Sequence, residues 1–173
     1  VVEASHPVPD LAGAKAAQEM LEMASALGEE DLLIMLLSGG GSSLLCLPPD
    51  SVSHEDMVEL TRGLLASGAP IQEMNVVRKH VSRIQGGRLA QATRGKTLCL
   101  VISDVPGDEI SAIASGPTEP DPSTYAQALD VIRRWHVVTP VSVLNHLQRG
   151  AGLPLQDPQA ASLPRPAETP KPA

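Results

Sequence analysis

An apolar run that ends in three consecutive glycines constrains the fold of this chain more than any other feature of its sequence. Residues 32–45 read LLIMLLSGGGSSLL, so that six apolar residues lead directly into Ser38 and the glycines. A short apolar run of this kind is typical of a buried strand in a parallel sheet. Glycine allows positive φ angles and the close approach of other groups to the backbone. The segment therefore predicts a buried strand at 32–37, a tight turn, and a helix that begins at Ser42 or Ser43.

Helices and strands alternate along the rest of the chain. Asp10 can cap a helix of strong helix formers that Gly28 ends, and TLCLVIS predicts a second strand at 97–103. Further helices are predicted at about 54–66, 71–85, 89–93, 124–135 and 141–149. This alternation is that of a doubly wound α/β domain, in which ligands bind beyond the carboxyl ends of the strands. The glycine turn and the long loop after the second strand both lie at that end.

The composition changes near residue 154. Six prolines occur in the last twenty residues, which predicts an extended linker at 154–173 and an ordered domain at 1–153. The chain opens on VVEASHPVPD, which has no initiator methionine and reads like the end of a strand. We therefore expect a fragment that begins inside a domain.

The turn between the first strand and its helix offers a site for an anion. It consists of Ser38, Gly39, Gly40, Gly41, Ser42 and Ser43. Its successive N–H groups can form a concave anion site, which a helix N-terminus and the serine hydroxyls would strengthen. The turn has no Gly-Lys-Ser/Thr of a Walker loop and lacks the last glycine of GxGxxG, and the chain has no GxSxG hydrolase elbow. A phosphate or nucleotide site and a merely tight turn are the two interpretations.

One segment of this acidic chain is strongly basic. The formal net charge is −7, yet no acidic residue lies between Glu73 and Asp104. The cations of this basic segment are Arg78, Lys79, Arg83, Arg88, Arg94 and Lys96. On the predicted helix, Asn75, Arg78 and Lys79 lie within one arc, and together they suit a carboxylate and a phosphate. The alternative is a solvent-exposed basic face.

Asp104 and Asp108 are candidate metal ligands. They lie in ISDVPGD, near the end of the second predicted strand, where carboxylates commonly hold Mg²⁺ against nucleotide phosphates. The segment ASGPT at 114–118 follows and adds backbone and hydroxyl groups. Aspartates are also common turn formers, so that each of the two has a structural explanation as well.

Composition argues against several kinds of partner. An acidic chain with one Trp, one Tyr and no Phe has neither the charge nor the stacking surfaces that nucleic acid requires. No apolar run reaches the length of about 18 residues that spans a bilayer, so no membrane partner is expected. Cys46 and Cys99 form neither a zinc motif nor a disulfide framework, which favours a reducing compartment, the cytoplasm.

Five segments of the chain occur together, in the same order, in a known family. They are SHPVPD, SGGGSSLL, NVVRKHVSRIQGGRLA, ISDVPGD and IASGPTEPDP, and they cover about residues 3–125. In these segments the chain closely resembles the MOFRL-type glycerate kinases, also called glycerate 2-kinases. ETPKP near the end is similar to the segment between the two domains of that family. The resemblance implies a Rossmann-like, three-layer α/β/α fold with a mostly parallel sheet, and an active site in the cleft toward a second α/β domain.

The resemblance also implies a reaction. It is the ATP-dependent phosphorylation of D-glycerate, typically to 2-phosphoglycerate, with a divalent metal such as Mg²⁺. By similarity, the glycine turn would contact phosphate of the nucleotide or the substrate. Asn75, Arg78 and Lys79 would face the cleft and bind substrate, and Asp104 and Asp108 would lie near the metal. We expect Lys79, Arg78 and Asp104 to be catalytic.

The chain departs from that family in two places. Family members carry an essential lysine upstream of SHPVPD and a second domain with its own catalytic arginine, and this chain contains neither. We therefore expect the fragment to be inactive alone, with the missing C-terminal domain of the same protein as its partner, and a homodimer is compatible with the sequence. Two alternatives stay open: an oxidoreductase of the hydroxypyruvate reductase type, and a non-catalytic fragment that binds phosphate ligands.

Overall fold

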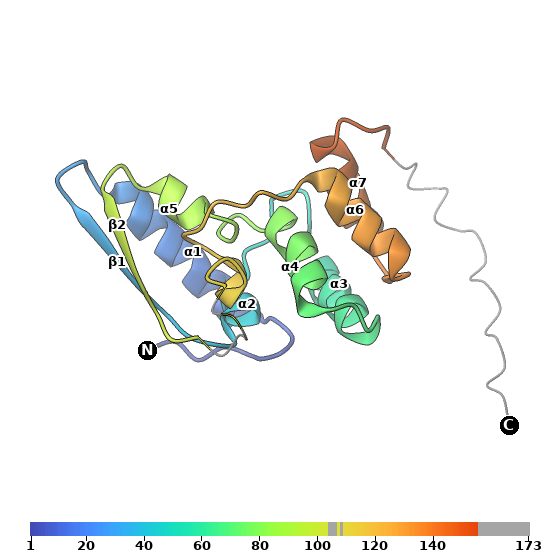
Figure 1. The fold of residues 1–173 in the computed structure, drawn as a ribbon, viewed down its shortest axis with the longest axis horizontal. Helices are drawn as coiled ribbons and strands as arrows, with labels where there is room; N and C mark the ends of the chain where they lie inside the picture. Colours follow the sequence, from blue (N-terminus) through green and yellow to red (C-terminus); the bar gives the residue numbers. More distant parts are fainter. Residues whose placement is uncertain (104–106, 108, 156–173) are drawn as a thin grey trace, which may run out of the picture.

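The elements follow the order that the sequence predicts. The computed structural model describes residues 1–103, 107 and 109–155, arranged as in Figure 1. The helices are α1 (Leu11–Ala26), α2 (Gly41–Leu44), α3 (His54–Ala66), α4 (Ile71–His80), α5 (Arg88–Ala92), α6 (Tyr125–Arg134) and α7 (Val141–Gly150), and the strands are β1 (Leu32–Leu37) and β2 (Lys96–Val101). A 3-10 turn, η1 (Ile113–Ser115), lies between β2 and α6.

Short polar side chains begin three of the longer helices. Asp10 Oδ1 accepts a hydrogen bond of 2.8 Å from the Gly13 N–H in the first turn of α1. Ser53 Oγ accepts from a backbone N–H of α3, and Thr124 forms a capping box with Gln127 at the start of α6. Each cap satisfies an amide that the helix leaves without a partner, which stabilises the helix by about 1 kcal/mol. These boundaries are local properties of the sequence.

The two strands form a parallel pair. Their register runs from Leu32 beside Lys96 to Leu37 beside Val101. Helices α1 and α5 cover one face of the pair, as Figure 1 shows, and Met35 is buried in the apolar cluster that forms there. A parallel pair with a helical layer confirms the predicted α/β class.

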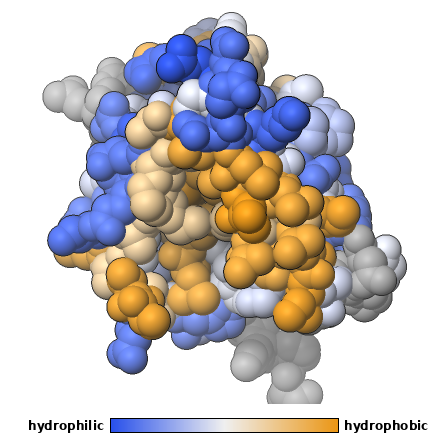
Figure 2. All heavy atoms as spheres, turned by 90° about the vertical axis from the view of Figure 1, so that its left-hand side faces the viewer, coloured by the Kyte–Doolittle hydropathy of each residue, from blue (hydrophilic) through white to orange (hydrophobic). Residues whose placement is uncertain are grey.

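The opposite face of the pair is exposed, which corrects the prediction of a strand buried on both sides. Ile34 and Leu36 of β1 expose 55% and 72% of their surface, and Leu100 of β2 exposes 53%. Figure 2 views the molecule from the side of the strands and shows apolar residues gathered there. Because side chains of a strand alternate between its faces, the apolar run is divided between a covered and an uncovered side. Within the described ranges, no helix covers the second side.

A second apolar core lies among helices α3, α4, α6 and α7. Leu60, Val77, Leu129 and Leu147 belong to it, and each exposes at most 3% of its surface. The sheet region and this helical region meet where the glycine turn approaches α4. The fold therefore places two apolar cores on either side of the predicted site.

Helix α4 ends at His80, ahead of its predicted end at Gln85. Val81 leaves the helical conformation with a φ of −116° and a ψ of 29°. Ser82 Oγ then accepts hydrogen bonds of 3.2 and 3.1 Å from the N–H groups of Ile84 and Gln85. A nearby hydroxyl competes with the helix for backbone donors, so the apolar spacing continues after the helix has ended.

None of the helices formed by residues 1–103, 107 and 109–155 has both the length and the apolar character needed to cross a membrane. The predicted linker at 154–173 lies almost entirely outside the described residues, and the domain boundary at residue 153 stays a prediction.

Candidate functional site

Segments that are far apart in the sequence line one pocket between the two cores. Its volume is about 390 Å³. The residues that line it include His6, Gly39, Gly40, Ser42, Arg78 and Ala114. They come from SHPVPD, the glycine turn, α4 and η1, which are parts of four segments that the sequence singles out. The structure thus brings the predicted turn and one predicted cation to the same pocket.

Two of the three glycines in the turn meet a structural requirement. Gly40 has a φ of 81° immediately before α2, a conformation that favours glycine. A Cβ on Gly41 would lie 2.5 Å from the Cβ of Ala114, so the turn approaches η1 more closely than a side chain allows. The N–H groups of Gly39, Gly40, Gly41 and Ser42 donate no hydrogen bond to any residue that the structure describes. Within the described part of the chain, these donors are therefore left for another acceptor.

Arg78 is a buried cation at the edge of this pocket. It exposes 7% of its surface, and burial lowers the pKa of its guanidinium. Its Nη1 donates a hydrogen bond of 3.3 Å to Asn75 Oδ1. Among the described residues, no carboxylate forms an ion pair with it. A buried charge without a counter-charge is unfavourable, and an anion in the pocket would compensate it.

Asn75 connects Arg78 to the far wall of the pocket. Its Nδ2 donates to the carbonyl oxygen of Ala112 at 3.1 Å, and its Oδ1 also accepts from Ser115 Oγ at 3.2 Å. Ser115 Oγ lies 2.9 Å from Ser42 Oγ in the glycine turn. A chain of hydrogen bonds therefore runs from the turn through Ser115 and Asn75 to the guanidinium of Arg78. Asn75 itself does not line the pocket but orients a residue that does.

Lys79 lies in a different environment from its neighbour Arg78. It lines a separate pocket of about 190 Å³, and its Nζ lies 3.7 Å from Asp121 Oδ1. The side chains of both residues expose only 9% of their surface. Successive helical residues point about 100° apart, which explains how adjacent cations reach different sites. The catalytic and substrate-binding roles of Lys79 stay predictions.

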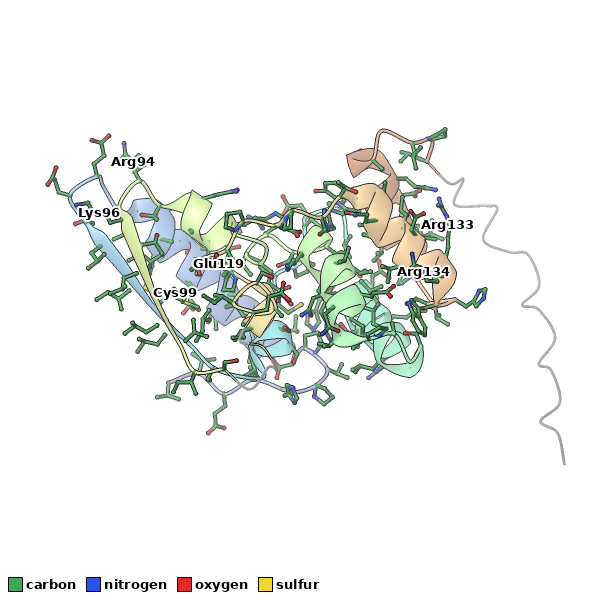
Figure 3. All side chains as sticks on the ribbon, in the orientation of Figure 1. Arg94, Lys96, Cys99, Glu119, Arg133 and Arg134 are labelled. Carbon is green, nitrogen blue, oxygen red and sulfur yellow. The ribbon has the colours of Figure 1, made fainter. Side chains whose placement is uncertain are left out.

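The other cations of the basic segment are spread over the molecule, and within the described part of the chain only Arg78 of this segment lines the larger pocket. Arg83 forms an exposed ion pair, and Arg88 donates to the backbone carbonyl oxygens of Lys79 and Gln85. Arg94 and Lys96 lie at the amino end of β2, at the far end of the strands from the glycine turn (Figure 3). The charge run in the sequence is therefore not one surface.

The predicted metal ligands cannot be placed in this pocket. Asp104 and Asp108 lie outside the described residues. Among the residues that the structure does describe, no group of three or more His, Cys, Asp or Glu side chains could hold a metal ion. The magnesium site stays a prediction.

Gln85 and Ser115 belong to the site although neither is among the site residues predicted from the sequence. Gln85 Nε2 donates to the carbonyl oxygens of Ser42 and Leu45, both at 2.8 Å, and so holds the glycine turn in place. Ser115 is fully buried and has a φ of 57°, as part of a left-handed stretch from Ala114 to Gly116. The sequence signal was indirect in both cases, because each residue immediately precedes a glycine in a segment already singled out.

The thiol of Cys46 should be inert in the folded protein. Burial raises the pKa of Cys46 to about 12, although the charge of Arg78 opposes this shift. Because the thiolate is the reactive form, we expect iodoacetamide at about pH 8 to leave Cys46 unmodified. Cys99, which is partly exposed, serves as the internal control, and both cysteines should react once the protein is unfolded. Mass spectrometry of the peptides measures the alkylation of each cysteine. Rapid alkylation of Cys46 in the folded protein would contradict its burial.

A parallel strand pair, a glycine turn beyond the first strand and a buried arginine beside that turn define a class: a mixed α/β protein with a pocket at the carboxyl end of its sheet. Residues 1–148 match the family described as "Domain of unknown function (DUF4147)", and the chain belongs to this family.

Comparison with named proteins confirms the resemblance to glycerate 2-kinases. A "Glycerate 2-kinase" from Pyrococcus horikoshii is 43% identical over 153 residues, which are 87% of this chain and 34% of that protein. A relative from Agrobacterium vitis, provisionally named a hydroxypyruvate reductase, is 48% identical over 155 residues, 89% of this chain and 35% of that one. A crystal structure of a glycerate kinase from Thermotoga maritima matches with a TM-score of 0.77 and 47% identity, covering 84% of this chain and 35% of that one. The chain spans about a third of the length of these relatives.

Proposed function

We propose that the protein containing this chain is a glycerate 2-kinase, which transfers the γ-phosphoryl group of ATP to D-glycerate and yields 2-phosphoglycerate. The observation that supports this most is the buried guanidinium of Arg78, which pairs with no described carboxylate. It lines a pocket beside backbone amides that donate to no described residue. Such a pocket favours an anionic ligand. Its volume of about 390 Å³ lies toward the small end of ligand sites, which suits a three-carbon acid.

Two kinds of hydrogen-bond donor in the pocket would each bind a different charged group of the reactants. Arg78 offers a planar set of N–H groups that matches a carboxylate. The amides from Gly39 to Ser42 would bind an oxygen of the transferring phosphoryl group. Phosphoryl transfer depends mainly on positioning and on neutralising charge, and these groups can serve both functions.

Further parts of the machinery lie around this pocket. Asp104 and Asp108 would hold Mg²⁺, which supplies neutralisation of the phosphate charge when bound. Lys79 would act from the neighbouring pocket. The second domain of the longer relatives would close the cleft, so that this chain alone would be inactive. The two free cysteines, Cys46 and Cys99, support a cytoplasmic location.

A coupled assay on the longer protein that contains this chain tests the proposal. We expect ADP to form from Mg-ATP only when D-glycerate is present, and the product to be 2-phosphoglycerate by ³¹P NMR. The name of the Agrobacterium vitis relative favours a second candidate, an NADH-dependent reduction of hydroxypyruvate. Oxidation of NADH by hydroxypyruvate, without ADP formation from glycerate, would replace the kinase by that reductase.

A further inference from the structure

We propose that Ser42 presents a hydrogen-bond acceptor, not a donor, to the pocket, and therefore selects ligands by a hydroxyl group. The ligand class is a hydroxy carboxylate, whose carboxylate lies on Arg78 and whose hydroxyl donates to Ser42 Oγ. The choice of a carboxylate for Arg78 rests on the proposed function, whereas the direction of the hydrogen bonds rests on the side chains of the described residues.

The two neighbours of the Asn75 side chain determine the orientation of its amide. The guanidinium of Arg78 can only donate, and it lies 3.3 Å from one end of the amide. The carbonyl oxygen of Ala112 can only accept, and it lies 3.1 Å from the other end. Reversing the amide would place donor against donor and acceptor against acceptor. Asn75 Oδ1 therefore faces Arg78, and Nδ2 faces Ala112.

The proton of Ser115 follows from that orientation. Ser115 Oγ lies 3.2 Å from Asn75 Oδ1, which is an acceptor, so that Ser115 must donate to it. Ser115 exposes none of its surface, and water cannot compensate two oxygens that face each other without a proton between them. A serine hydroxyl has a single proton, and this contact uses it.

Ser42 must then supply the proton of the next contact. Ser42 Oγ lies 2.9 Å from Ser115 Oγ, and since Ser115 has no second proton, Ser42 donates and Ser115 accepts. The Ser43 hydroxyl also donates within the protein, to the Gly40 carbonyl oxygen at 3.4 Å. In this arrangement both hydroxyl protons are engaged within the protein, which is an alternative to the prediction that these serines donate to an anion.

The chemistry of the ligand follows from the lone pairs of Ser42 Oγ. Ser42 lines the pocket, and with its proton engaged by Ser115 its Oγ can offer only lone pairs to a ligand. Lone pairs repel the oxygens of carboxylate and phosphate groups and attract an O–H donor. Arg78 and the amides of the glycine turn attract negative charge in the same pocket. A small acid that also carries a hydroxyl satisfies all three, and an acid without one leaves Ser42 Oγ unpaired.

Binding of a series of acids to the longer protein tests this assignment. The probes are D-glycerate, (R)-lactate, 3-hydroxypropanoate and propanoate, and calorimetry measures each dissociation constant. (R)-Lactate lacks the 3-hydroxyl group of D-glycerate, and 3-hydroxypropanoate lacks the 2-hydroxyl group. In the unmodified protein, D-glycerate should bind about five- to tenfold more tightly than whichever of these two lacks the hydroxyl that Ser42 recognises. Ser42→Ala should abolish that preference and change propanoate binding by less than about twofold.

A second variant tests which serine donates in the hydrogen bond between Ser42 and Ser115, and distinguishes this from a merely structural role of Ser42. Ser115→Ala removes the acceptor of the Ser42 proton, which can then turn into the pocket and donate to an oxygen of the ligand. We expect propanoate to bind more tightly than in the unmodified protein while the hydroxyl preference falls. Ser142→Ala, which removes a hydrogen bond to Asp56 in the α3–α7 interface, is the matched control and should change neither value.

The outcomes distinguish this inference from the proposed function. Equal weakening of all four acids by Ser42→Ala would overturn the inference, as would failure of the unmodified protein to bind any of them. Weaker propanoate binding in Ser115→Ala would overturn the inference that Ser42 donates its proton to Ser115. An intact hydroxyl preference without ADP formation from glycerate would overturn the kinase alone.

Discussion

Replacing Arg78 with methionine should lower kcat/KM for D-glycerate by about 100- to 1,000-fold in the longer protein. The substitution keeps much of the side-chain volume and removes the buried guanidinium that lines the pocket. A charge-assisted contact formed in a desolvated site is strong, because water does not compete for it. Steady-state ADP formation at varied D-glycerate concentration measures the loss. An effect of less than about threefold would remove Arg78 from the site.

The stability of the Arg78→Met variant, unlike its activity, should not fall. Arg78 has no ion-pair partner among residues 1–103, 107 and 109–155, so that its removal relieves a desolvated charge. We expect the free energy of unfolding of Arg78→Met to be unchanged or slightly raised. Arg83→Met is the matched control, because Arg83 belongs to the same basic segment but forms an exposed ion pair with Asp50. It should retain kcat/KM within about twofold.

Replacing Lys79 with methionine should destabilise the protein by about 3 kcal/mol. The Lys79 side chain pairs with Asp121, and the carboxylate lies in the same buried setting. Without the lysine, Asp121 would keep the Ser123 contacts to Oδ1, while its buried Oδ2 accepts no hydrogen bond and lies 3.6 Å from His80 Nδ1. Removing one partner of a buried ion pair is strongly destabilising, because the charge of the other partner stays buried without compensation. Urea unfolding followed by circular dichroism measures the difference.

Two further variants interpret the Lys79 result. Asp121→Asn in the Lys79→Met background should recover most of the lost stability, because the second substitution removes the remaining charge. Lys96→Met, at the exposed start of β2, should change stability by less than about 0.5 kcal/mol. A Lys79→Met protein that is as stable as the unmodified one but loses turnover would instead support the predicted catalytic role of Lys79.

Much of the helical architecture could be predicted because local interactions set it. The helix at 54–66 has the predicted bounds, since Ser53 caps it and an apolar face continues to its end. The strand at 32–37 also ends where the glycines begin. The end of α4 at His80 was not predictable from spacing, because Ser82 binds backbone donors there and the Arg83 N–H bonds to the distant Leu47 carbonyl oxygen.

The candidate site shows the same division. The glycine turn after the first strand and the cations of a nearby helix were predictable, because apolar runs, glycines and charges are read directly from residue types. The packing of the whole fold was needed to show that Arg78 lines the same pocket as the turn while Lys79 pairs with Asp121 in another pocket. It also joined Asn75 to Ser115, forty positions along the chain. Hydrogen bonds between distant segments depend on how the two cores pack, and packing is a property of the whole fold that no local pattern contains.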